Sequence, residues 1–157
     1  MPHVRPQDRT MWRALKSWLT SRRARVVSGT GGTVADMAAH IQGLLDAPMG
    51  SSLIVEVSGL EDAFLQFTAG PDRIQIDYPQ ITAGQVRREA ALRKAFGAAG
   101  LTPYESRGSD GARFLDCDVP RDATGAAILV QRILESLFGV SASTELRFVG
   151  NGPMPAA

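Results

Sequence analysis

Residues 63–78, AFLQFTAGPDRIQIDY, hold two apolar segments on either side of a turn. The second segment, Arg73 to Tyr78, alternates polar and apolar residues, the pattern of a strand with one buried side. Gly70 and Pro71 lie between the segments, and both residues favour turns. The stretch therefore predicts a β-hairpin of strands 63–68 and 73–78. A preceding β-branched segment, 53–57, adds a third strand, and the short connections favour an antiparallel meander.

Three segments show helical spacing of apolar residues. In 33–47 the apolar positions follow the i, i+3, i+4, i+7 rule, and Thr33 with Asp36 predicts a capping box at its start. Segment 83–99 ends before Gly100, and segment 122–138 ends before Gly139, the usual glycine stop of a helix. Further strands are expected at 104–107 and 112–117, with a short edge strand at 146–149.

The expected fold is α+β, in the order helix, three strands, helix, two strands, helix. A five-stranded antiparallel sheet would carry the helices on one face. At 157 residues, with 44% hydrophobic and 21% charged residues, the composition is that of a globular protein with a single folded domain. We expect that domain at 33–149 and a disordered tail at 150–157.

Charge divides the chain into two parts. Residues 1–26, which we call the basic arm, hold seven basic residues against Asp8, a net charge of +6, whereas the remainder carries ten basic and fifteen acidic residues. A helix is expected at about 7–25, with Trp12, Leu15, Trp18 and Leu19 on one face. Residues 28–32 would form a glycine-rich hinge, so the arm and linker span 1–32. The candidate contact residues of the arm are Arg13, Lys16, Arg22, Arg23 and Arg25.

Several roles stay open for the basic arm. It could be a solvated extension, dock on a protein or on the acidic remainder of its own chain, lie on anionic lipid, or meet nucleic-acid phosphates. No apolar run reaches the roughly 18 residues of a membrane span, and the N-terminus has no apolar signal-peptide core. With one cysteine there is no intrachain disulfide, and a cytoplasmic location is expected.

The chain offers little material for catalysis or metal binding. Cys117 lies between Asp116 and Asp118, which disfavour a thiolate, and the histidines, His3 and His40, give it no clear base. We therefore expect Cys117 to pack as a small apolar residue, and the two aspartates to lie on one solvated strand face. One cysteine and two histidines cannot complete a zinc site. No enzymatic activity, cofactor or metal is expected.

Several sequence features resemble one bacterial family. They are the strand Phe64-Leu65-Gln66-Phe67, the passage from Leu92 through Phe96-Gly97 and Gly100-Leu101 to Pro103, the pair Phe114-Leu115, and the ending Leu137-Phe138-Gly139-Val140. Together with the element order, these features resemble the type III secretion chaperone-like (Tir-chaperone-like) domains over about residues 33–149. Leu101 stands where a tryptophan is common in that family. The resemblance implies a protein-binding domain, often a homodimer, without catalytic residues.

Two functions follow as expectations. The first is a non-catalytic, chaperone-like domain that binds an unidentified polypeptide as a homodimer. Its contacts would come from apolar strand surface that one helix layer leaves uncovered, at Phe64, Leu65, Ile74, Ile76 and Tyr78. The alternative is a regulatory or scaffold module that the basic arm recruits to a membrane or to nucleic acid.

Overall fold

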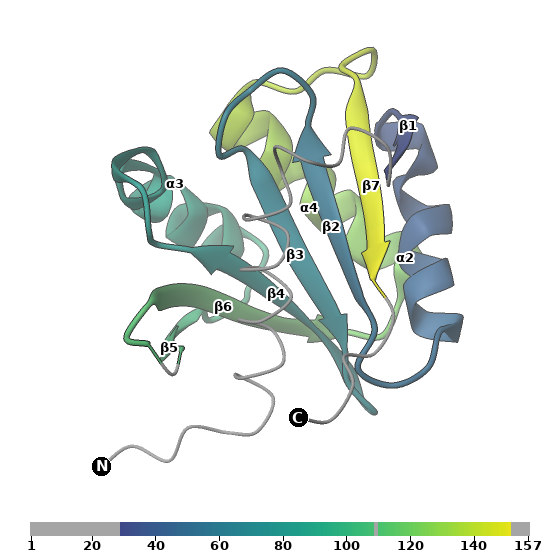
Figure 1. The fold of residues 1–157 in the computed structure, drawn as a ribbon, viewed down its shortest axis with the longest axis horizontal. Coiled ribbons are helices and arrows are strands. Elements are labelled where there is room, and N and C mark those ends of the chain that lie inside the picture. Colours follow the sequence, from purple (N-terminus) through teal and green to yellow (C-terminus); the bar gives the residue numbers. More distant parts are fainter. Residues whose placement is uncertain (1–28, 109, 152–157) are drawn as a thin grey trace.

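The fold is one antiparallel sheet with three α-helices packed on one of its faces (Figure 1). The computed structural model describes residues 29–108 and 110–151, and the basic arm lies outside them. The strand order is β1-β7-β2-β3-β4-β6-β5. The strands are β1 (Thr30–Gly32), β2 (Ser52–Val57), β3 (Phe64–Ala69), β4 (Arg73–Pro79), β5 (Tyr104–Arg107), β6 (Arg113–Pro120) and β7 (Leu146–Asn151).

The helices begin and end at the signals that the sequence carries. They are α2 (Met37–Asp46), preceded by the 3-10 turn η1 (Val34–Asp36), then α3 (Ala83–Ala98) and α4 (Ala123–Phe138). The Thr33 amide donates to Asp36 Oδ2 at 2.9 Å, so the expected capping interaction forms, although the first turn is 3-10. Gly139 ends α4 at φ 65°, a left-handed conformation that favours glycine.

Two expectations at the ends of the domain are wrong. Thr30–Gly32 is not a hinge but strand β1, antiparallel to β7. Strand β7 is not an edge strand, because it lies between β1 and β2 and extends to Asn151, past the expected domain end at 149. Leu146 and Phe148 are 0% and 2% exposed, as befits a central strand. Thus the described sheet has seven strands, where five and a short edge strand were expected, while the α+β class and the β2-β3-β4 meander are confirmed.

Burial corrects the expected uncovered apolar surface. Leu65, Ile74, Ile76 and Tyr78 are all 0% exposed and belong to the main core, which the sheet forms with the three helices. Helix α4 packs against both α2 and α3, so the helix layer has no gap at its centre. These four residues therefore lie in the core between the sheet and the helix layer, whereas Phe64 belongs to a separate cluster.

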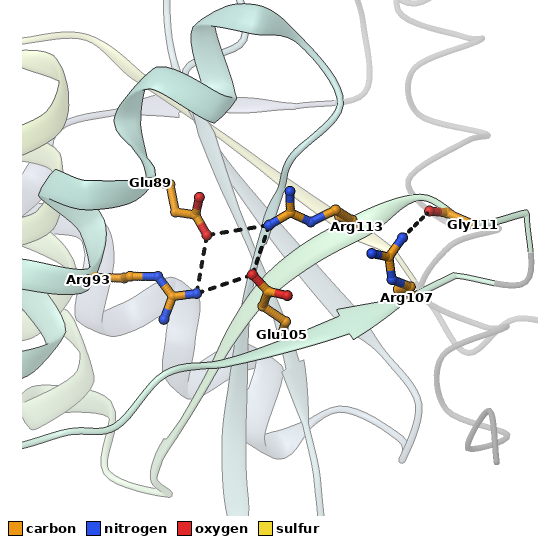
Figure 2. Close-up of polar contacts among 6 residues, drawn as sticks. All are labelled: Glu89, Arg93, Glu105, Arg107, Gly111 and Arg113. Carbon is orange, nitrogen blue, oxygen red and sulfur yellow. Dashed lines mark hydrogen bonds and ion pairs between the residues drawn. The ribbon is translucent and has the colours of Figure 1, made fainter. Parts of the chain in front are cut away.

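Helix α3 is attached to the sheet partly through charge (Figure 2). It buries few residues, namely Gln85, Leu92 and Phe96. Its Glu89 and Arg93 join Glu105 of β5 and Arg113 of β6 in a closed ring of ion pairs, with N···O distances of 2.8–3.7 Å. Partly exposed pairs contribute little singly, but a network of alternating charges fixes the orientation of α3 over the β5–β6 end of the sheet.

The core assignment gives a stability test. Ile76→Ala should lower the free energy of unfolding by about 2–5 kcal/mol, because it removes buried methyl groups and leaves a cavity. Ile81→Ala is the matched control: Ile81 is 45% exposed just before α3, and its change should stay within about 0.5 kcal/mol. Urea denaturation measures the free energy of unfolding of both variants. Equal losses would contradict the assignment of Ile76 to the core.

Candidate functional site

The candidate site is the second face of the sheet, which is the face opposite the three helices (Figure 1). Because side chains alternate along a strand, residues between the core positions of β2, β3, β4 and β6 project from this face. The strand register aligns them in a row, in which each residue is the direct cross-strand partner of the next. The row runs Val149, Ile54, Gln66, Asp77, Asp116 and Tyr104.

Three carboxylates gather on the second face, and we call Asp77, Asp116 and Asp118 the acidic cluster. Asp77 and Asp116 are cross-strand partners on β4 and β6. Asp118 is the partner of Gln75, in the next pair on the same face. Asp77 is 1% and Asp116 is 0% exposed. Buried carboxylates are costly unless cations or hydrogen-bond donors meet them, and neither Asp77 nor Asp116 is without an interaction partner.

A hydrogen-bond network organises the outer side of the cluster. The Tyr104 hydroxyl donates to Asp118 Oδ1 at 2.9 Å, and Gln75 Nε2 donates to the Tyr104 hydroxyl at 3.1 Å and to Asp116 Oδ2 at 3.3 Å. Arg73 Nη1 reaches Asp118 Oδ2 at 2.8 Å. Side chains from β4, β5 and β6 thus hold one another in place through these hydrogen bonds.

The electrostatics of the network follow from burial and from the shared negative charge. Burial raises the pKa of Tyr104, and so do its hydrogen bond to Asp118 and the charges of Asp118, Asp116 and Asp77. Tyr104 therefore stays protonated and acts as a donor. Asp118 likewise raises the pKa of the Arg73 guanidinium. The charges of all three aspartates thus act on Tyr104, whereas among them Asp118 alone acts on Arg73.

An apolar strip adjoins the acidic cluster on the second face. It consists of Ile54, Phe64, Phe114 and Val149, which contact one another as a separate cluster and are 0–6% exposed. Of the contact residues expected from sequence, Phe64 alone lies here. The second face is thus amphipathic, with an apolar part that extends from β7, β2 and β3 to Phe114 of β6 and an anionic part on β4 and β6.

Unsatisfied donors complete the description of this surface. Gln66 is 2% exposed and lies in the row between Ile54 and Asp77. Among the described residues, its Nε2 atom has no hydrogen-bond partner, and neither has Thr68 Oγ1 on the same face of β3. Buried polar atoms in a native protein normally have partners, so the second face offers hydrogen-bonding capacity to a ligand.

The other candidate residues have structural roles. Cys117 is 0% exposed in the main core, which confirms the expected apolar packing. Asp116 and Asp118 share one strand face as expected, but the expectation of solvation is wrong for Asp116, which is buried. His40 stacks on Phe148 with ring centroids 3.9 Å apart. Arg13, Lys16, Arg22, Arg23 and Arg25 of the basic arm lie outside the described residues.

Sequence reasoning missed Tyr104, Gln66, Gln75 and Asp77 as members of a site. A signal was present, since Arg73, Gln75 and Asp77 alternate with the core residues of β4. What the sequence did not supply was the β4–β6 register, which places Asp77 beside Asp116 and Gln75 beside Asp118.

The described residues lack two kinds of feature, a metal-binding cluster and a membrane-spanning helix. Within 29–108 and 110–151, no group of three or more histidine, cysteine, aspartate or glutamate side chains is arranged to hold a metal ion. In the same part of the chain, every helix is too short or too polar to cross a lipid bilayer.

The chain was compared with known proteins in three ways. No family model, curated protein or solved structure matches it.

Cys117 gives a test of the chemistry. Burial, with the charges of Asp118 and Asp116, raises its pKa to about 11. At pH 8 the folded thiol should react with a disulfide reagent about 100-fold more slowly than the urea-unfolded chain, because the thiolate is the reactive form. The unfolded state ionises first, so this thiol's contribution to stability is complete below about pH 9 and is lost as the pH rises through 11. Equal folded and unfolded rates would contradict the buried placement.

Proposed function

We propose that this chain is a non-catalytic, chaperone-like protein-binding domain whose second sheet face takes a basic, amphipathic polypeptide segment. One observation carries the proposal: an apolar strip and an acidic cluster lie side by side on a sheet face that no described helix covers. A helix with one apolar side and flanking arginines or lysines matches both halves of this surface. The resemblance to secretion chaperone-like domains supports the same function class.

The sheet edges are less suited to binding than the face. At one edge, β5 presents Glu105 and Arg107, and charged residues at an edge oppose the addition of another strand. At the other edge, β1 has only three residues. A partner strand would find few backbone groups to pair with at either edge, which favours recognition through side chains on the second face.

We propose a homodimer as the working assembly, through the helix layer and not through the second face. Val86 of α3 and Ile128 of α4 are 46% and 50% exposed, on two helices that pack against each other. Exposed branched residues on adjoining helices are the kind of surface that a two-fold interface buries. The second face then stays available to the partner in each copy.

Site-specific photo-crosslinking tests the function. A benzoylphenylalanine at position 73, on the second face of β4, should capture a partner from the source cells, and mass spectrometry should map the captured segment to a basic, amphipathic stretch. The control is the same residue at position 132, which is exposed on α4. Position 132 should instead yield the adduct of two copies, twice 16.8 kDa. Equal capture of partners at both positions, or captured segments without basic character, would contradict the proposal.

The alternative function, recruitment to membrane or nucleic acid, draws its support from the +6 charge and two tryptophans of the basic arm. Such recruitment needs an arm whose cationic side chains are free to meet phosphates. The two proposals therefore differ in where the basic arm lies when no partner is present.

A further inference from the structure

We infer that the basic arm docks on the second face of its own chain and occupies the surface that a partner must take. The docking itself needs no partner, whereas its regulatory meaning rests on the function proposed above. The arm would act as an internal competitor, so that a partner binds by displacing it.

The burial of the second face calls for a further layer. Antiparallel sheets commonly leave one face to solvent, and cross-strand neighbours cover the sides of a side chain but not its end. Yet Ile54 and Phe64 are 0% exposed, and Asp116 is also 0% exposed. The described helices all lie on the opposite face (Figure 1). The occupant of the second face must therefore bring both apolar groups and cations.

Charge selects the basic arm as that occupant. The arm carries seven basic residues and one acidic residue, and the rest of the chain has a net charge of −5. On the second face, Asp118 contacts both Arg73 and the Tyr104 hydroxyl, and three carboxylates gather within two strands. Arginine forms paired hydrogen bonds with carboxylates and is suited to buried ion pairs. Six of the seven basic residues in the arm are arginines.

The apolar residues of the arm match the apolar strip. Trp12, Leu15, Trp18 and Leu19 share one face of the helix that the sequence predicts. Tryptophan and leucine side chains on the apolar strip would cover Phe64 and its neighbours. An arm of this composition left in water would expose both indoles, so docking also removes apolar area from solvent.

Chain length and tether position allow the docking. The described chain begins at Gly29, beside β1 at one edge of the sheet, while the acidic cluster lies on β4 and β6 near the other edge. A helix of residues 7–25 would be about 28 Å long at 1.5 Å per residue. Seven strands at roughly 4.8 Å spacing span about 29 Å. The arm is therefore long enough to cross the sheet from β1 to the acidic cluster.

The covalent link between the arm and the domain favours the arm over a free partner in competition for the second face. A short linker gives the arm an effective concentration of about 1 mM at its own second face, so a free partner of equal intrinsic affinity loses to it. Salt weakens the docking, since the screening length falls from about 10 Å at 0.1 M to about 3 Å at 1 M ionic strength.

Tryptophan fluorescence of the full chain tests the inference, because both tryptophans, Trp12 and Trp18, lie in the arm. At low salt, acrylamide should quench them several-fold less than in 1 M NaCl, and dilution should not change the quenching constant. Asp77→Asn with Asp116→Asn should raise the constant several-fold. Glu135→Gln, on exposed α4, is the matched control and should leave it unchanged.

A second variant guards against misfolding of the first. Arg22→Gln, Arg23→Gln and Arg25→Gln leave the sheet untouched and should expose the tryptophans to the same extent. Four outcomes would overturn the inference: equal quenching at low and high salt, no effect of the arginine changes, shielding lost on dilution (which indicates a second copy), or shielding that appears only with phosphatidylserine vesicles or duplex DNA. Full exposure of the tryptophans would leave partner capture at position 73 intact, so the two proposals fail separately.

Discussion

The pairing of β4 with β6 in a single register is the constraint on which the rest of the structure depends. It places Ile76 opposite Cys117 on the core side and Asp77 opposite Asp116 on the other. Because side chains alternate with a period of two, a slip by one residue would move the aspartates into the apolar core. Burial of the isoleucines and the cost of burying unpaired carboxylates thus enforce the same register. The amphipathic second face is a direct product of that choice.

Much of the fold follows from local sequence, and the second face does not. The strand Arg73–Pro79 and the helix Ala83–Ala98 lie within one residue of their expected ends, since alternation and capping are local signals. Thr30–Gly32 was missed because its glycines suggest flexibility, and its pairing with β7 joins residues more than 100 positions apart. Likewise, nothing local shows that β7 has a neighbour on both sides.

The candidate site was misplaced for a related reason. Composition shows that Ile74, Ile76 and Tyr78 are apolar, but not whether three helices suffice to cover them. The three helices do cover them. The candidate binding surface is on the other face, where Phe64, Asp77 and Asp116 lie on three different strands. Tyr104 was passed over because a single tyrosine in a short strand carries no spacing signal. Its hydrogen bonds to Gln75 and Asp118 arise from tertiary pairing alone.

The proposed docking brings together two regions of opposite charge, the basic arm and the acidic remainder of the chain. We propose that the acidic cluster and the tethered basic arm form a switch, in which a partner competes with the arm for the second face. Zero-length carbodiimide crosslinking tests this most directly, since it joins a lysine amine to a carboxylate in contact, and the arm has a single lysine, Lys16. The account predicts that Lys16 links to the acidic cluster, with yields that fall at high salt. Links from Lys16 spread over acids of the helix layer, such as Glu135, with none to the acidic cluster, would contradict it.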